Sequence, residues 1–215
     1  MKIVKLTGTV ELLSGLHIGG GDDTMKIGGI DNGVIKDANS DNPYIPGSSL
    51  KGKMRTLLEW DAGVVGIGDG NPFNSKLLSD PIFADGTIKS NAETLLKLFG
   101  DKEGEFGITR ISVGDCSLSQ KSKDKDMVLT EGKWENTIDR RTGTAKHGVG
   151  ARQTERVPAG VKFDFDIRIK VLDGDNEEEL KKMVEKGLDL IQIDYLGGNG
   201  SRGYGRVNFI DRKWE

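Results

Sequence analysis

The sequence predicts an α+β fold built on the ferredoxin-like plan. Strand-like alternation of apolar and polar residues occurs near both ends of the chain, one helix pattern follows the first strand, and another precedes the last. Alternating strands are half-buried, as in an antiparallel sheet with one solvated face. The order strand, helix, strands, strand, helix, strand is that of the ferredoxin-like plan.

The first half of this plan begins with residues 2–13, whose even-numbered apolar residues share one face of a strand. A glycine- and aspartate-rich stretch follows and predicts mostly loop. Apolar residues at helical spacing then predict a helix over residues 48–58, with Ser48 as its N-cap. Residues 61–90 show no clear period.

The second half contains the clearest strand pattern, the unbroken alternation of residues 161–171. Before it, residues 91–99 predict a short helix, and residues 108–118 predict a strand with a bulge near Gly114. After it, Asp175 and Glu178 suggest a capping box for a helix that reaches Ile191. A final strand is expected at residues 206–210.

The chain divides into three parts on this basis. Residues 1–118 form the first part of the core with loop insertions, and residues 161–215 complete it. Residues 119–160 are polar, contain few apolar anchors, and are expected to project as an insertion.

Composition excludes several classes of protein. The 215 residues carry a net charge of −3 and a single cysteine, so an internal disulfide or a multi-cysteine zinc site is excluded. No apolar run reaches transmembrane length, and the N-terminus lacks the apolar region of a signal peptide. These features favour a cytoplasmic protein without a membrane partner.

The segment GGNGSRGYGRV, residues 197–207, contains the letters G-x-G-x-x-G. A dinucleotide-binding fingerprint follows a strand, opens a helix and needs an acidic residue about 20 positions later. Here the glycines follow a helix and precede the last strand, so that interpretation fails. A tight turn is the simplest alternative, but five glycines exceed what a turn requires. We therefore expect a phosphate-binding loop, in which the contacts come from Gly198, Gly200, Arg202, Gly203 and Arg206.

Two further segments are basic and contain glycine. In residues 47–55, Lys51 and Arg55 share one flank of the predicted helix and Lys53 lies on the other. Residues 140–156 hold five basic residues and one acidic residue, typical of an arm that binds a polyanion. Each could also be a solvated surface.

The sequence also resembles a known family, the RAMP superfamily. The segments that carry the resemblance run nearly end to end: GLHIGGGDD, GIDNGVIKD, YIPGSSLKGKMRTLLE, TIDRRTGTAKHGVGARQTERVPAG and the C-terminal glycine segment. More narrowly, they are similar to the repeated backbone subunit of the type III-A CRISPR (Csm) effector complex.

The resemblance implies a ferredoxin-like, RRM-related core with a β-hairpin thumb at residues 119–160. It implies a filament of copies that binds guide RNA alongside other Csm subunits, and a metal-dependent endoribonuclease that cuts target single-stranded RNA at six-nucleotide intervals. It places the catalytic residue and metal ligand at Asp31, with Mg²⁺ or Mn²⁺ as cofactor. The RNA contacts implied by the family and by the basic segments are His17, Lys51, Lys53, Arg55, Arg140, Arg141, Arg152, Gly198, Gly200, Arg202, Gly203 and Arg206.

Two alternatives to this function remain open. A stand-alone, guide-processing RAMP endonuclease would work without metal and use a histidine, either His17 or His147. A purely structural RNA-binding subunit would leave the cutting to another protein. Loop aspartates other than Asp31 are expected to be turn residues, and the aliphatic residues 127–129 are candidates for a wedge between bases.

Overall fold

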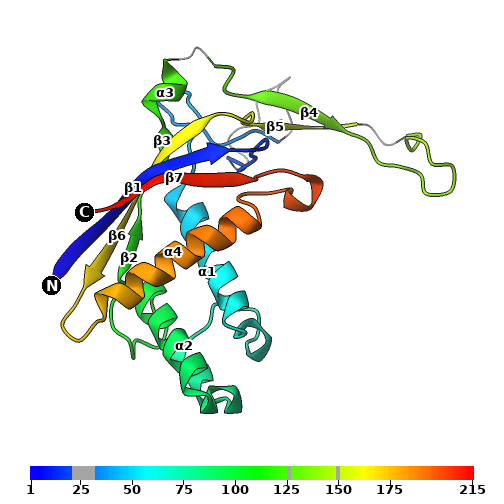
Figure 1. Cartoon of the computed structure of the whole chain (residues 1–215). Coiled ribbons are helices and arrows are strands. Elements are labelled where there is room, and N and C mark those ends of the chain that lie inside the picture. The colour runs from blue at the N-terminus through cyan, green and yellow to red at the C-terminus, as the bar shows by residue number, and fades with distance from the viewer. Residues whose placement is uncertain (21–31, 125–126, 149–150) are drawn as a thin grey trace.

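The computed structural model describes residues 1–20, 32–124, 127–148 and 151–215. An antiparallel sheet carries helices on one face, and a separate two-stranded hairpin extends away from it (Figure 1). The structure therefore confirms a mixed fold of helices and antiparallel sheet. Within the described residues, no helix combines the length and the apolar composition needed to cross a membrane.

The described elements follow one another along the chain. The strands are β1 (Lys2–Leu12), β2 (Ile111–Val113), β3 (Ser117–Leu118), β4 (Glu131–Glu135), β5 (Arg152–Arg156), β6 (Lys162–Val171) and β7 (Val207–Trp214). The α-helices are α1 (Gly47–Asp61), α2 (Gly86–Phe99), α3 (Gln120–Lys123) and α4 (Glu177–Ile193). Short 3₁₀ turns are η2 (Val65–Ile67), η3 (Ser75–Ser79), η4 (Pro81–Ala84) and η5 (Gly200–Arg202).

The main sheet has the strand order β2-β6-β1-β7, and β3 also pairs with β6. All pairings are antiparallel. In the central pair, Leu6 lies opposite Ile167 and Val10 opposite Phe163, and all four side chains are buried. The alternation recognised in the sequence thus places one face of each strand against the helices.

Helices α1 and α4 pack closely against each other over the sheet. Gly187 of α4 lies against Met54 of α1, where a Cβ atom would stand 2.3 Å from the methionine Cγ. Met54 is fully buried, and so is Leu188, which follows the glycine on α4. The glycine lets the two helices approach, because any side chain there would displace the core methionine.

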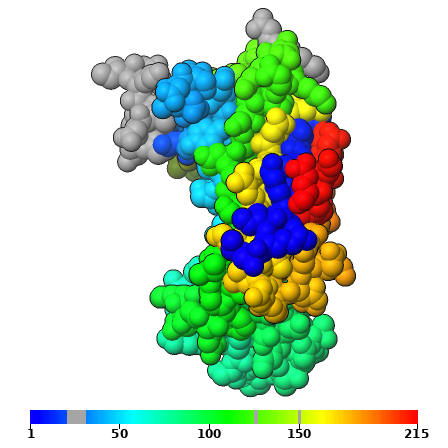
Figure 2. All heavy atoms as spheres, turned by 90° about the vertical axis from the view of Figure 1, so that its left-hand side faces the viewer, coloured from blue at the N-terminus to red at the C-terminus, as the bar shows by residue number. Residues whose placement is uncertain are grey.

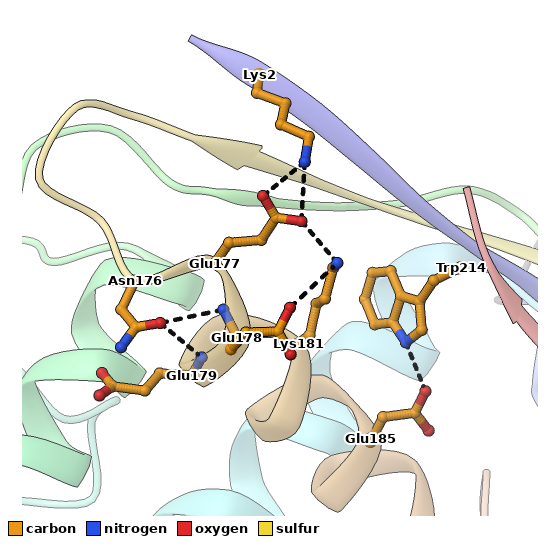
Figure 3. A network of polar contacts seen from close by, with 8 residues as sticks. All are labelled: Lys2, Asn176, Glu177, Glu178, Glu179, Lys181, Glu185 and Trp214. Atoms are coloured by element: carbon orange, nitrogen blue, oxygen red, sulfur yellow. Dashed lines mark hydrogen bonds and ion pairs between the residues drawn. The ribbon is translucent and has the colours of Figure 1, made fainter.

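Polar contacts fasten α4 to β1 and β7, two neighbouring strands of the sheet (Figure 3). Glu177 accepts two hydrogen bonds from the ammonium of Lys2 on β1, at 3.0 and 2.8 Å. Further along the helix, Glu185 accepts a hydrogen bond of 2.8 Å from the indole of Trp214 on β7. The helix is therefore fixed to both strands in addition to its buried stripe.

Both predicted N-caps are wrong. The N-cap residue of α1 is Pro46, not Ser48, and the Gly47 amide instead donates to the carboxylate of Asp115 at 2.7 Å. The N-cap of α4 is Asn176, whose side chain accepts from the amides of the first turn. Asp175 is used elsewhere, since its carboxylate binds the guanidinium of Arg110.

Two stretches differ in detail from their predicted structure. Residues 61–90, which show no period, contain three 3₁₀ turns and the start of α2, capped by Asp85. The strand expected at residues 108–118 is divided into β2 and β3 around Gly114, where the bulge was expected.

Strands β1, β6 and β7 meet at the surface above the helical end of the molecule (Figure 2).

Candidate nucleic-acid interface

The glycine-rich segment forms a compact turn between α4 and β7. It contains the 3₁₀ turn η5 and closes through a hydrogen bond of 2.8 Å from the Leu196 amide to the Gly205 carbonyl. Backbone φ angles are positive at Gly197, Gly203 and Gly205. This geometry favours glycine at all three positions.

Three of the five glycines are required by packing within the chain. A Cβ atom at Gly205 would stand 1.9 Å from the Leu196 carbonyl oxygen, and one at Gly197 would stand 2.5 Å from the His17 oxygen. At Gly200 it would overlap the Tyr195 ring, 2.1 Å from Cγ. Of the glycines expected to contact phosphate, Gly200 is therefore one whose lack of a side chain the packing of the chain itself requires.

Gly198 and Gly203 are different, because both are exposed. A Cβ at Gly198 would make only an ordinary contact, 3.6 Å from a ring carbon of His17. At Gly203 it would meet no described atom within 4 Å, and only the positive φ favours glycine. Among the five, Gly198 is thus the position whose lack of a side chain best suits an external ligand.

His17 lies directly against this segment. Its carbonyl oxygen accepts a hydrogen bond of 2.9 Å from the Gly198 amide. Its ring Nδ1 lies 2.7 Å from the carbonyl oxygen of Glu155 on β5. A carbonyl only accepts, so Nδ1 carries a proton and donates it to the Glu155 carbonyl.

The β4–β5 hairpin meets the same segment through Glu135, the last residue of β4. One oxygen of this carboxylate lies 2.9 Å from the guanidinium of Arg202, and the other accepts 3.2 Å from the hydroxyl of buried Tyr204. Arg152 lines the same surface hollow as Glu135 and Arg202. Burial raises the pKa of Glu135, but Lys133, Arg202 and the Tyr204 hydroxyl together hold it below its usual value. The hollow therefore contains an ionised carboxylate paired with Arg202, and Arg152 also lines it.

Two of the three basic side chains of α1 are paired within the chain. Lys53 forms an ion pair of 2.6 Å with Asp194 and lies 3.7 Å from the centre of the Tyr195 ring. Arg55 donates to Glu59 at 2.7 Å and to the Phe73 carbonyl at 2.8 Å. Both side chains therefore serve the fold, although Lys53 lies beside the glycine-rich segment through Tyr195.

Lys51 is the basic residue of α1 best placed for an external anion. It is half-buried, and burial, followed by the charge of Arg55, lowers its pKa. Gly52 beside it is exposed, and a Cβ atom there would meet no described atom within 4 Å. A glycine in a helix interior costs about 1 kcal/mol relative to alanine. Close approach of a ligand backbone would explain it.

The remaining basic candidates are exposed. Arg140 and Arg141 are exposed in the long turn that joins β4 to β5, where Asp139 accepts from the Arg141 amide. Arg206 is exposed directly before β7. The hairpin projects beyond the sheet at the same end as the glycine-rich segment (Figure 1).

The polar face of the sheet does not resemble a base-stacking platform. Its central strands present Thr7 and Thr9 opposite Asp166 and Asp164, with Arg168 paired to Asp166 at 2.9 Å. Aromatic rings are what RRM-type sheets use to stack bases. The polar face of these two strands offers no such ring, which points to the hairpin and the glycine-rich segment instead.

The candidate catalytic residue Asp31 lies outside the described residues. Asp37, which is described, accepts from the amides of Asn39 and Ser40 and is a turn residue, as expected. Across the described ranges, no three histidine, cysteine, aspartate or glutamate side chains come together to hold a metal ion.

Sequence reasoning missed two acids of the hairpin, Glu135 and Glu155. Each joins the hairpin to a segment far away in the sequence. The usable signal was weak: Glu155 is the one acidic residue in the basic stretch 140–156.

Comparison with known proteins decides the family. A model of the RAMP superfamily matches residues 9–208. The chain belongs to the RAMP superfamily. This RAMP protein is 42% identical to the CRISPR system Cms endoribonuclease Csm3 of Methanocaldococcus jannaschii, over 98% of its own length and 79% of the relative. It is 37% identical to the protein of that name from Enterococcus italicus, over 96% and 89% of the two chains.

A third relative, the Csm3 endoribonuclease of Streptococcus thermophilus, is 39% identical over 96% of this chain and 86% of its own. These relatives confirm the resemblance to the Csm backbone subunit. A chain from the cryo-EM structure of the Type III-B Cmr-beta bound to cognate target RNA has a TM-score of 0.65 and 16% identity. The match covers 99% of this RAMP protein but 61% of that chain, and it supports the fold alone.

Proposed function

We propose that this RAMP protein is a guide-RNA-binding backbone subunit of a type III-A CRISPR complex that cleaves bound target single-stranded RNA at six-nucleotide intervals. The observation that carries the proposal is the near-full-length similarity to relatives named Csm3 endoribonuclease, at 37% to 42% identity. Its partners would be guide RNA, target RNA, further copies of itself and other Csm subunits. Its setting would be the cytoplasm.

The strand order supports a ferredoxin-like core. In that plan two strand–helix–strand units interleave in one antiparallel sheet, and the order β2-β6-β1-β7 with α1 and α4 as crossovers is consistent with it. The core would comprise residues 1–118 and 161–215. Residues 119–160, which hold the β4–β5 hairpin, would be the thumb.

The guide would follow the end of the molecule at which the hairpin meets the glycine-rich segment. The exposed Gly198, the arginines around Glu135 and the half-buried Lys51 support this path. Contacts of this kind bind phosphate and shape rather than base edges. Base pairing with the guide would then supply sequence specificity.

Catalysis is assigned to Asp31 with a divalent ion, Mg²⁺ or Mn²⁺. A bound ion of this type would stabilise negative charge at the scissile phosphate. Since the described residues offer no cluster of further ligands, Asp31 would share the ion with water and phosphate oxygens. The residues that the structure describes would bind the RNA. They would also fix the segment that begins at Asn32 through its hydrogen bonds.

The test is cleavage by the assembled complex. Subunits are combined with a guide, an end-labelled complementary RNA and Mg²⁺, and products are resolved at single-nucleotide resolution. The proposal predicts a ladder with six-nucleotide spacing that EDTA abolishes and that a scrambled RNA does not give. An intact target would support the structural subunit instead. Chelator-resistant cutting of repeat RNA by the isolated chain would support guide processing.

A further inference from the structure

Trp134 on β4 is a large aromatic residue that the chain leaves 62% exposed. Its two neighbours in the sequence are held on the opposite face of the hairpin. The ammonium of Lys133 lies 4.5 Å from the centre of the buried Tyr204 ring, and the carboxylate of Glu135 accepts a hydrogen bond of 3.2 Å from the Tyr204 hydroxyl. Because successive side chains of a strand point to opposite faces, the indole points away from Tyr204.

The residues that share this face of the hairpin leave the indole accessible. Gly132, two residues earlier on β4, lies on the same face and has no side chain. The residue opposite Trp134 on β5 is Gln153, which is half-buried. The indole therefore has a glycine beside it on its own strand and a polar amide across the hairpin, and most of its surface can contact a ligand.

The strand that carries the indole is fixed to the core. β4 pairs with β5 along its whole length. After β5, Val157 exchanges two backbone hydrogen bonds with Leu16, of 2.8 and 2.9 Å. The guanidinium of Arg156 lies 5.1 Å from the centre of the Tyr204 ring. A ring that is held in place before binding loses little conformational entropy when a ligand stacks on it.

The charges of the hairpin favour a polyanion as the partner. Exposed basic residues of the hairpin are Arg140, Arg141, Lys146 and Arg152. The acids of its two strands are neutralised within the chain, Glu131 by Arg156, Glu135 by Arg202 and Glu155 by Lys36. RNA combines phosphates, which basic side chains bind, with flat bases, which stack on aromatic rings. An exposed indole among exposed arginines suits this combination better than it suits an apolar protein surface.

We propose that Trp134 is a stacking platform for an unpaired base of bound RNA. The inference rests on the proposed function and deepens it, because it names the part of the RNA that the hairpin contacts. Every base has a face that can stack, so the contact adds affinity without sequence preference. The polar face of the central strands of the sheet offers no ring for this purpose, and the hairpin supplies one.

The variants are Trp134→Leu, which keeps apolar bulk without a ring, and Trp134→Phe, which keeps a ring. The matched control is Trp60→Leu, because Trp60 is 65% exposed and lies in the last turn of α1, which runs away from the hairpin (Figure 1). Each variant is assembled into the complex, and its affinity for guide RNA and for target RNA is measured at several salt concentrations. Two further series replace single nucleotides of the guide or of the target by abasic residues.

We expect Trp134→Leu to weaken the binding of one of the two RNAs by about tenfold. The salt dependence should stay that of the wild type, because no phosphate contact is lost. Trp134→Phe should keep most of the affinity, and Trp60→Leu should bind like the wild type. In the wild type, an abasic residue at the stacking position should cost a similar factor, and Trp134→Leu should abolish that cost. The series in which this cost appears shows whether the base belongs to the guide or to the target.

Wild-type affinity of Trp134→Leu for both RNAs would overturn the inference. So would a loss of affinity in Trp134→Leu that leaves the cost of every abasic residue unchanged, because the indole would then contact protein, such as a second copy of the chain. Lack of cutting by a wild-type complex that binds both RNAs would refute only the cleavage part of the proposed function, and the affinities would still decide this inference. A wild-type complex that binds neither RNA would overturn both.

Discussion

The backbone amide of Gly198 donates a hydrogen bond of 2.9 Å to the carbonyl oxygen of His17. A second bond of the same length joins the Gly205 amide to the Gly15 carbonyl. Two motifs at opposite ends of the sequence thus form one unit beside the hairpin. Substitutions within this unit can distinguish the glycines that the fold requires from Gly198, whose lack of a side chain suits an external ligand.

Gly198→Ala should weaken guide binding without loss of stability. The added methyl group would make only an ordinary contact with the chain, 3.6 Å from the His17 ring, but it would stand where a phosphate approaches. We expect an affinity loss of about tenfold, or about 1.4 kcal/mol, by filter binding or fluorescence anisotropy. The control Gly205→Ala should instead lower the free energy of unfolding by about 2 kcal/mol or more, because a left-handed residue is replaced and its methyl group would clash with the Leu196 carbonyl. Equal behaviour of the two variants would contradict this division.

Lys51 and Lys53 should also differ: substitution of Lys51 should affect RNA binding, and substitution of Lys53 should affect stability. Lys53→Met breaks the contacts with Asp194 and Tyr195, and it should lower the free energy of unfolding by about 1 kcal/mol. Lys51→Met should leave the melting temperature unchanged and reduce the slope of log affinity against log salt by about 0.7, the loss of one phosphate contact on a single strand. A wild-type salt slope for Lys51→Met would remove it from the RNA path.

Glu135→Gln should strengthen guide binding. The carboxylate neutralises Arg202 and Lys133, whereas an amide of the same shape still accepts from the Tyr204 hydroxyl. Both cations would then be available to phosphate, and the salt slope should steepen by about 0.7 per added contact. Glu185→Gln on α4 makes the same change of net charge beside Arg212 and should have no effect. A similar gain in both variants would indicate overall charge rather than release of Arg202.

Asp175 should stabilise the fold in a pH-dependent manner. Burial raises the pKa of this carboxyl, but its bonds with Arg110 and the Leu172 amide outweigh burial and lower it below 3.8. The stabilisation is therefore full above pH 3.8 and lost as the pH falls through the lower folded-state value. Asp175→Ala leaves Arg110 buried without its partner and should cost about 3 kcal/mol at pH 7. Denaturant unfolding from pH 7 to pH 2 should show the difference shrink, and a constant difference would contradict the assignment.

The sequence predicted the strands well because alternation reports directly on a half-buried sheet. Strand β6 is the clearest case, since six alternate residues from Val161 to Val171 mark its inner face. Helix caps were predicted poorly, because the cap depends on competition for a side chain. Asp175 has the spacing of a capping residue, but Arg110, far away in the sequence, binds it.

The candidate site was predictable in outline only. Its basic and glycine-rich segments are visible as local composition, and the structure brings the glycine-rich segment, His17 and the base of the hairpin together. What composition cannot show is pairing between distant residues. Arg55 is held by Glu59 and Phe73, and the acids Glu135 and Glu155 act across the hairpin, so no local pattern identifies them. The assignment of Asp31 rests on the family resemblance and stays a prediction.

Cleavage by the Asp31→Ala complex tests the central claim most directly. The matched control is Asp37→Ala, which removes a nearby carboxylate that only binds the amides of its own turn. With complementary RNA and Mg²⁺, we predict that Asp31→Ala binds the target like the wild type but gives no six-nucleotide ladder, whereas Asp37→Ala still gives it. A ladder that persists in Asp31→Ala would contradict the account.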